Sequence, residues 1–428
     1  MAELSFQDLR FRHSNGKVVV EFLGNYQFEV DEEALSNISR YEINEKGSKG
    51  SNSIKFADID EETARRRFNA VLDYGLANLT NATTRKKTLY VHRYSGIPLI
   101  GTTSFGIIDR NTNMIEVRPL TGCNMNCIFC SVDEGLASKK TAEVVIEEDY
   151  LVTEVKKLVE FKGCECNSAK GRMHNRACPD LCHIIINSQG EPTLYKPLPE
   201  LIRNLKAVAG IKTITLITNG TLLNEKLIDE LAASGLTMMN VSLNAVDPKI
   251  AKVMEGHGLY DVGKAKKMAA YAAKTAIKVC LAPVIIGSYN EGEMEKIVQF
   301  AKEIGATTAM QNYLYYKRGR NPRDAKQIPW EEFYEKLEEL ERKYGSKLIF
   351  SAADYSIIKT KPLPKPYRKG QVVKATIIAE GRYPREYIAA ANERIITLPD
   401  CEKTLKPNDA VKVKIVSDKH NIFYGKAL

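Results

Sequence analysis

Three cysteines lie close together on one short stretch of the chain. The run Leu120-Thr-Gly-Cys-Asn-Met-Asn-Cys-Ile-Phe-Cys places Cys123, Cys127 and Cys130 in a C-x3-C-x2-C spacing directly after a strand-like segment. Three neighbouring thiolates can hold three irons of a cubane cluster and leave the fourth iron open to an exchangeable ligand. The alternative for this spacing is a zinc knuckle, although structural zinc sites usually use four protein ligands.

A second group of cysteines follows the first. Cys164, Cys166, Cys178 and Cys182 have the spacing C-x-C-x11-C-x3-C, and the residues between them are polar. Four thiolates can bind an auxiliary iron–sulfur cluster, a single iron or zinc. Free buried cysteines are the alternative. We favour a second metal centre and leave the identity of its metal open.

Composition restricts the class of protein. The 428 residues include nine cysteines, with 44% hydrophobic and 27% charged residues, as in ordinary globular proteins of two or three domains. Clustered cysteines in a chain without a recognisable signal peptide favour metal or redox chemistry in a reducing compartment. No apolar run is long enough to cross a bilayer. We therefore expect a cytoplasmic protein with no membrane span.

The elements that must position the first cysteines are alternating strands and helices. From about residue 113, short apolar runs alternate with amphipathic helical segments, which indicates parallel strands joined by crossovers. About six such units predict an α/β fold, a parallel (β/α)6-type partial barrel. Expected strands after the cysteines are His183–Asn187, Thr213–Ile217, Met239–Leu243, Lys278–Ile285 and Ala309–Leu314, and expected helices are Leu151–Phe161, Pro197–Ala209, Lys226–Ser234, Gly263–Thr275 and Glu293–Ile304.

Changes in pattern along the chain suggest four parts. We expect a mixed α+β extension over 1–112, the barrel core over 113–345 with a cysteine-rich insertion at 163–183, and a proline-rich linker over 346–368. Residues 369–428 predict a small all-β barrel, with strands at Gln371–Ala379, Arg394–Leu398, Ala410–Val416 and Asn421–Tyr424.

Residues 113–320 resemble the radical S-adenosylmethionine (radical SAM) superfamily. The resemblance rests on the C-x3-C-x2-C spacing, with the aromatic Phe129 before the last cysteine, and on Gly190-Glu-Pro after the second strand. It implies a [4Fe–4S] cluster on Cys123, Cys127 and Cys130, whose open iron binds S-adenosylmethionine. It also implies reductive cleavage of that cofactor to a 5′-deoxyadenosyl radical, with a ferredoxin- or flavodoxin-type reductant.

The same resemblance implies contacts to S-adenosylmethionine. Gly190-Glu-Pro would lie at the methionine ammonium, and the strand Asn240-Val-Ser-Leu-Asn-Ala would reach the ribose and methionine carboxylate. The family often has Asp where this chain has Asn244. The expected cofactor-binding residues are Phe129, Gly190, Glu191, Pro192, Thr218, Asn219, Ser242, Asn244, Pro283 and Gln311.

Residues 369–428 resemble a TRAM domain, a small five-stranded barrel of RNA-modifying enzymes. Residues 361–428 carry fourteen Lys and Arg against seven Asp and Glu, so this tail holds most of the +9 net charge. A basic groove with aromatic residues suits looped RNA, whereas a merely solvated basic face is the alternative. The expected RNA-binding residues are Lys374, Arg382, Arg385, Arg394, Lys412, Lys414 and Tyr424.

These features together favour a radical SAM enzyme that modifies an RNA substrate, either tRNA or rRNA. The chain is similar to tRNA methylthiotransferases but lacks cysteines in residues 1–122, where those enzymes hold an auxiliary cluster. As a whole it resembles an uncharacterised archaeal group of radical SAM enzymes with TRAM tails. One alternative is radical modification of a protein, peptide or lipid, with the small barrel used for docking. Another is an RNA-binding iron–sulfur protein without turnover. No cobalamin domain is expected.

Overall fold

The computed structural model describes residues 1–45, 50–163 and 181–428, which divide into two compact units. The first unit comprises Met1–His92 and Thr141–Val145, and the second comprises Arg93–Lys140 and Ile146–Leu428. Residues 93–112, expected in the amino-terminal extension, fall in the second unit, where β9 (Gly106–Asp109) pairs with β10 (Met114–Arg118). No helix in the described ranges has both the length and the apolar run needed to cross a membrane.

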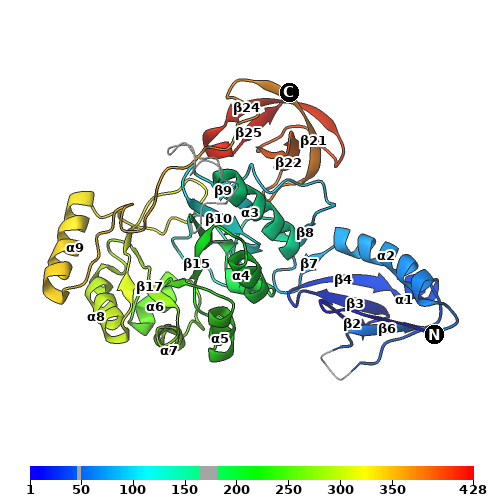
Figure 1. Cartoon of the computed structure of the whole chain (residues 1–428), viewed down its shortest axis with the longest axis horizontal. Coiled ribbons are helices and arrows are strands. Elements are labelled where there is room, and N and C mark those ends of the chain that lie inside the picture. The colour runs from blue at the N-terminus through cyan, green and yellow to red at the C-terminus, as the bar shows by residue number, and fades with distance from the viewer. Residues whose placement is uncertain (46–49, 164–180) are drawn as a thin grey trace. The chain divides into compact units, whose positions relative to one another are not determined.

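The first unit combines two mainly antiparallel sheets with two helices (Figure 1). Alternating apolar side chains on the strands pack on the buried face of α2 (Glu61–Ala77), around Phe11, Phe56 and Phe68. Asp60 begins α2 by accepting a hydrogen bond from the Thr63 N–H. The remaining elements are β1 (Ala2–Ser5), β2 (Leu9–Ser14), β3 (Lys17–Phe22), β4 (Tyr26–Asp31), α1 (Glu32–Ser36), β5 (Tyr41–Glu42), β6 (Ser53–Phe56), β7 (Thr80–Asn81), β8 (Lys87–Val91) and β12 (Ala142–Ile146).

The second unit contains an open seven-stranded sheet. Its order is β19-β17-β16-β15-β13-β10-β9, and every pair except the antiparallel β9–β10 edge is parallel. Six parallel strands confirm the predicted partial barrel in its coarse form. The strands after β10 are β13 (Cys182–Ile186), β15 (Ile211–Thr218), β16 (Met238–Val241), β17 (Lys278–Leu281) and β19 (Thr307–Thr308).

Amphipathic helices connect these strands (Figure 1). Asn224, Asp247 and Asp261 begin three of them by accepting backbone N–H bonds, while Gly305 and Gly345 end two others with positive φ. The helices are α3 (Glu148–Gly163), α4 (Leu198–Lys206), α5 (Glu225–Ala233), α6 (Pro248–Met254), α7 (Val262–Ala272), α8 (Met294–Ile304) and α9 (Trp330–Tyr344).

Two predicted strands differ from the observed ones. The segment Lys278–Ile285 forms β17 and then β18 (Val284–Ile285), because Pro283 between them has no N–H for a sheet ladder. The segment Ala309–Leu314 was expected as one strand, but β19 lies before it and β20 (Gln311–Asn312) within it. β18 and β20 pair in parallel as a separate two-stranded sheet.

A closed five-stranded barrel forms the carboxyl-terminal part of the second unit. Its order is β21-β22-β23-β25-β24, with Ile377, Ile396, Val413 and Phe423 in its core. The strand β22 is absent from the sequence prediction because three of its five residues are Ala, which is depleted in strands. The prediction of a strand at Asn421–Tyr424 was wrong, since β25 begins only at Tyr424. The strands are β21 (Val372–Glu380), β22 (Tyr387–Ala391), β23 (Arg394–Leu398), β24 (Ala410–Ser417) and β25 (Tyr424–Ala427).

Candidate active site

The three cysteines of the first group line one cavity at the carboxyl ends of the parallel strands. Residues Thr121–Gly122 form the short strand β11, which pairs in parallel with β14 (Gln189–Gly190) just before Cys123. The cavity has a volume of about 350 Å³. Parallel strands direct their following loops to one edge, and for this reason residues distant in sequence meet there.

Most of the expected cofactor-binding residues line this cavity. Pro192 and Pro283 are the exceptions: Pro192 is buried at the start of a short 3-10 helix, and Pro283 lies between two lining residues, Ala282 and Val284. The expected residues that do line the cavity, besides the three cysteines, are Phe129, Gly190, Glu191, Thr218, Asn219, Ser242, Asn244 and Gln311.

The cysteine thiols are suited to a positively charged metal centre. Burial, reinforced by the charge of Glu191, raises the pKa of Cys123, and burial with the charge of Glu255 raises the pKa of Cys127 well above its usual value. A thiol that is hard to ionise alone becomes a thiolate when it binds metal. The backbone N–H groups of Met125 and Glu134 lie 3.4 Å from the Sγ atoms of Cys123 and Cys130. Such N–H groups stabilise sulfur ligands, so the donor set fits a [4Fe–4S] cluster.

Gly190 allows two backbones to approach closely. Its φ is +140°, and a Cβ atom there would lie 1.8 Å from the carbonyl oxygen of Gly122. Only glycine fits this position, which keeps β14 beside the strand that leads into Cys123.

Glu191 is held on all sides by hydrogen-bond donors. Its Oε1 accepts from the N–H and hydroxyl of Thr193 and from the Thr218 hydroxyl at 2.6 Å, while its Oε2 accepts from the Asn219 N–H at 2.7 Å. Burial raises the pKa of this carboxyl group despite these donors. Glu191 therefore braces the end of β15 at the cavity wall.

Asn244 has a similar bracing geometry. Its Nδ2 donates to Glu255 at 2.6 Å, and its Oδ1 accepts from the Val284 N–H at 2.8 Å. Both ends of the amide thus bind protein groups. An amide suits these two contacts because it donates and accepts at once, whereas the family's Asp would only accept.

Sequence reasoning missed Glu255, a fully buried carboxyl group at the end of α6. The Cys127 thiol lies 2.8 Å from its Oε2, and burial raises the pKa of Glu255. The backbone around it also supports the cysteine loop, since the Asn126 and Ile128 N–H groups donate to the carbonyls of Glu255 and Met254. The glycine after it, Gly256, was a helix-end signal, but nothing local predicted that the carboxylate would face a cysteine.

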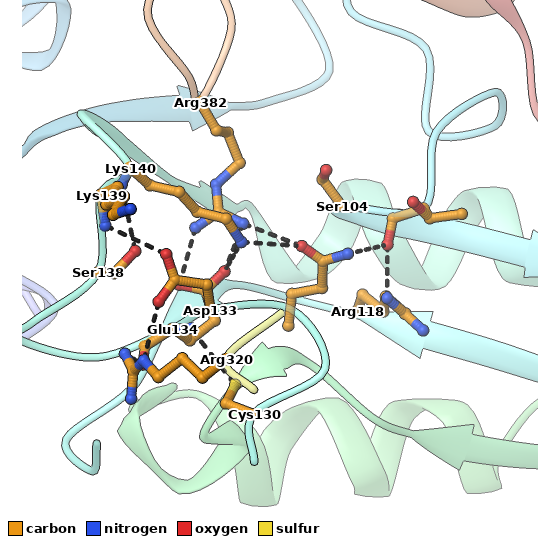
Figure 2. Close-up of polar contacts among 12 residues, drawn as sticks. Ser104, Arg118, Cys130, Asp133, Glu134, Ser138, Lys139, Lys140, Arg320 and Arg382 are labelled. Atoms are coloured by element: carbon orange, nitrogen blue, oxygen red, sulfur yellow. Dashed lines mark hydrogen bonds and ion pairs between the residues drawn. The ribbon is translucent and has the colours of Figure 1, made fainter. Parts of the chain in front are cut away.

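The segment that follows the cysteines, residues 131–140, is also fixed by buried charges (Figure 2). Arg320 donates to Asp133 at 2.8 Å and to the Cys127 carbonyl at 3.2 Å. Lys140 lies 2.5 Å from Glu134, and both side chains are 3% exposed. The Arg320 side chain therefore faces the protein and fixes the cysteine loop.

The expected RNA-binding residues divide by exposure. The prediction that Arg382 contacts RNA is wrong, because this residue is 3% exposed and forms an ion pair with Glu134 at 2.6 Å. Arg394 and Tyr424 are half-buried. The exposed members of the set are Lys374, Arg385, Lys412 and Lys414.

The second cysteine group falls almost entirely outside the described residues. Cys164, Cys166 and Cys178 lie there, whereas Cys182 opens β13 as a buried free thiol whose pKa is raised by burial to about 11. The second metal centre stays a prediction.

Comparison with known proteins agrees with the site. Residues 117–301 match the model of the Radical SAM superfamily. The uncharacterized protein MJ0103 of Methanocaldococcus jannaschii is 34% identical over 383 residues, 83% of this chain and 84% of its own length. A GTP 3′,8-cyclase of Peptoclostridium acidaminophilum is 30% identical over 190 residues, 44% of this chain; the chain spans about half (51%) of that enzyme's length.

Two solved structures of low identity are also similar to this chain over part of its length. SuiB of Streptococcus suis bound to S-adenosylmethionine covers 81% of this chain and 72% of its own, with 15% identity and a TM-score of 0.38. TYW1 with a lysine-pyruvate adduct covers 59% and 80%, with 19% identity and a TM-score of 0.40. The curated relative and the family match carry the assignment: this chain belongs to the radical SAM superfamily of enzymes and to the same family as MJ0103.

Proposed function

We propose that this radical SAM enzyme modifies an RNA substrate, either tRNA or rRNA. Its carboxyl-terminal TRAM-like barrel helps to bind that RNA. When bound, the [4Fe–4S] cluster and S-adenosylmethionine supply a 5′-deoxyadenosyl radical by one-electron reduction from a ferredoxin- or flavodoxin-type donor. The protein's own residues hold the cluster through three thiolates, shape the cofactor cavity and present the substrate to it.

The observation that carries the RNA proposal is a row of lysines on the barrel. Lys374 on β21 lies directly opposite Lys412 on β24, and Lys414 lies opposite Lys426 on β25. All four are exposed, and residues opposite or two apart share one face of a sheet. Within the described part of the chain, none of the four forms an ion pair. Like charges placed opposite each other destabilise a sheet, and a polyanion such as RNA relieves that repulsion.

Exposed aromatic and basic residues at the cavity mouth support the same proposal. After β20, Leu314 and Tyr316 line the cavity, and Tyr315 is 71% exposed beside the exposed Lys317. Exposed tyrosines suit stacking on unpaired bases, and lysines suit the phosphates between them. The GTP 3′,8-cyclases among the relatives are named for a nucleotide substrate, which is compatible with a nucleotide as the reacting unit.

The test compares RNA binding by the full chain and by a variant with Lys374, Lys412 and Lys414 changed to Ala. Its matched control changes Lys156, Lys226 and Lys274, three exposed lysines on helices or between them, to Ala. The barrel variant should lose affinity for bulk tRNA or rRNA, and its log–log salt slope should fall by about 2 units, since each lost phosphate contact removes about 0.7–0.9.

The reaction itself is tested by incubating the reduced enzyme and S-adenosylmethionine with RNA from cells that lack it. Mass spectrometry of the digested RNA should reveal a nucleoside whose mass changes after incubation with the active enzyme and not after incubation with the Cys127→Ala variant. Equal salt dependence in the two lysine variants, or a mass change on protein or lipid and none on RNA, would overturn the RNA proposal in favour of the docking alternative.

A second metal centre on Cys164, Cys166, Cys178 and Cys182 is part of the proposal. It predicts that changing Cys164 and Cys178 to Ala lowers bound metal while the cluster on the first three cysteines is retained. Elemental analysis would distinguish iron from zinc, and unchanged metal content would exclude the centre.

A further inference from the structure

One buried side chain of the carboxyl-terminal barrel, that of Arg382, contacts the segment that follows the cysteine loop. Arg382 lies in the connection between β21 and β22, and only 3% of it is exposed. Its guanidinium lies 2.6 Å from Glu134 Oε1 and donates to Glu134 Oε2 and to Gln189 Oε1, each at 3.0 Å (Figure 2). One planar group thus holds two partners that are distant in sequence.

Both partners of Arg382 are attached directly to the active site. The Glu134 N–H lies 3.4 Å from the Sγ of Cys130. Gln189 immediately precedes Gly190 and Glu191, and its strand β14 pairs with β11 just before Cys123. Arg382 therefore connects the segment after the last cysteine to β14, the strand that pairs with β11 before the first cysteine.

The connection that carries Arg382 is itself rigid. The backbone N–H of Arg382 donates to Glu386 Oε1 at 3.0 Å, and the backbone N–H of Gly381 donates to the Glu386 carbonyl at 2.5 Å. A Cβ at Gly381 would lie 2.4 Å from the Glu386 side chain, which explains the glycine there. These contacts fix the backbone from which the Arg382 side chain extends toward Glu134.

Other contacts keep the barrel in place without Arg382. The Ile395 and Phe423 N–H groups donate to the carbonyls of Ile100 and Gly101, each at 2.9 Å. A Cβ at Gly101 would lie 2.3 Å from Ile395, so the backbones are in close contact. Arg318 adds an ion pair to Glu386 at 3.3 Å. Loss of the Arg382 side chain alone should therefore leave the barrel folded and docked.

We propose that Arg382 is a positioning residue for the iron–sulfur cluster: through Glu134 and Gln189 it fixes the loop that holds Cys130 and the strand beside Cys123. The carboxyl-terminal barrel in this way completes the cluster site from outside the parallel-strand core. The proposal rests on the superfamily assignment and is independent of the substrate, so an incorrect RNA proposal would not affect it.

The test uses the full chain with its cluster reconstituted without oxygen. Arg382→Met removes the charge and retains the length, Arg382→Lys restores a charge, and Arg368→Met makes the same change at an exposed arginine of the barrel unit. The measurements are the rate of iron loss to a chelator, the midpoint potential of the cluster, and its EPR spectrum with and without S-adenosylmethionine. Near-ultraviolet circular dichroism checks that each variant is folded.

We expect Arg382→Met to lose iron about tenfold faster than wild type, with a shifted potential and EPR spectrum, because loss of the groups that orient metal ligands typically lowers metal affinity by about 10–100-fold. Arg382→Lys should restore part of the wild-type behaviour, and Arg368→Met should match wild type. Should Arg382→Met fail to fold, Glu134→Gln tests the same contact from the core side and should give the same direction of change. A folded Arg382→Met or Glu134→Gln with wild-type iron release, potential and EPR spectrum would overturn the proposal.

Discussion

The Oε2 atom of Glu191 accepts a hydrogen bond from the backbone N–H of Asn219 at 2.7 Å, which ties the segment after β14 to the end of β15. The two residues are 28 apart in sequence, and both line the cavity that contains the cysteines. Because its other oxygen binds Thr193 and Thr218, the carboxylate fixes the backbone of the cavity wall before any cofactor enters.

Glu191→Gln should weaken this brace. The amide of Gln presents an N–H group to one of the two sets of donors, so one buried donor loses its acceptor. We expect a loss of about 1–3 kcal/mol in the free energy of unfolding and weaker S-adenosylmethionine binding. Denaturation and equilibrium dialysis measure the two effects. Glu230→Gln, at an exposed position on α5, serves as the control; equal behaviour of the two variants would contradict the bracing role.

Gly190→Ala should be more damaging than an ordinary glycine substitution. The added methyl group would overlap the Gly122 carbonyl, so β11 and β14 would separate next to Cys123. We expect a loss of about 2 kcal/mol or more in stability, in the range of overpacked sites, together with lower iron content after reconstitution. Gly292→Ala is the matched change, because a Cβ there meets nothing within 4 Å. Normal iron loading in Gly190→Ala would disprove this account of the close approach.

Lys162 and Asp109 form a deeply buried ion pair that joins α3 to β9. Their charged atoms lie 2.9 Å apart with exposures of 0% and 1%, and Lys162 also donates to the Thr360 hydroxyl at 2.8 Å. Lys162→Met leaves the Asp109 carboxylate buried without its partner and should lower the free energy of unfolding by about 3–5 kcal/mol. The double variant Lys162→Met/Asp109→Leu should recover most of that loss in chemical denaturation. Equal stability of the single and double variants would show that the pair is not the origin of the effect.

The charge network around Glu134 predicts a pH dependence. Burial, together with the Arg382 charge, lowers the pKa of Lys140 from 10.5 to about 8. The unfolded chain therefore binds more protons than the folded one between these values, and the stability contributed by this group rises with pH across that window. Arg382→Met removes one cause of the lowered pKa, so it should gain less stability over the same range.

The stability difference between wild type and Arg382→Met should thus widen as the pH rises from about 8 to about 10. Guanidinium denaturation at several pH values measures it, with Arg368→Met expected to follow wild type throughout. A difference that stays constant or narrows would show that the Arg382 charge does not lower the pKa of Lys140.

The sequence was sufficient to predict the parts of the site that depend on local spacing. Cys123, Cys127 and Cys130 lie within eight positions of each other, and the strands before and after them follow from short apolar runs. The resemblance to the radical SAM superfamily implied that Glu191, Thr218 and Ser242 contact the cofactor. All three line the same cavity, where the carboxyl ends of parallel strands meet.

Contacts between segments far apart in the chain could not be predicted in this way. Arg382 and Glu134 are separated by 248 positions, and on the sequence alone Arg382 was one of several basic residues on a basic tail. Glu255 is 128 positions from Cys127, and a glutamate at a helix end is usually exposed. Burial of these charges depends on packing of the whole second unit, for which a single sequence has no periodic signal.

The most direct test of the central claim is to purify the protein without oxygen, measure iron and sulfide, and assay 5′-deoxyadenosine after adding reductant and S-adenosylmethionine, for wild type and Cys127→Ala. We predict iron and sulfide that decrease in the variant, and 5′-deoxyadenosine formation that wild type shows and the variant lacks. Zinc in place of iron at the three cysteines, or 5′-deoxyadenosine formation that persists in Cys127→Ala, would contradict the assignment of the cluster to this site.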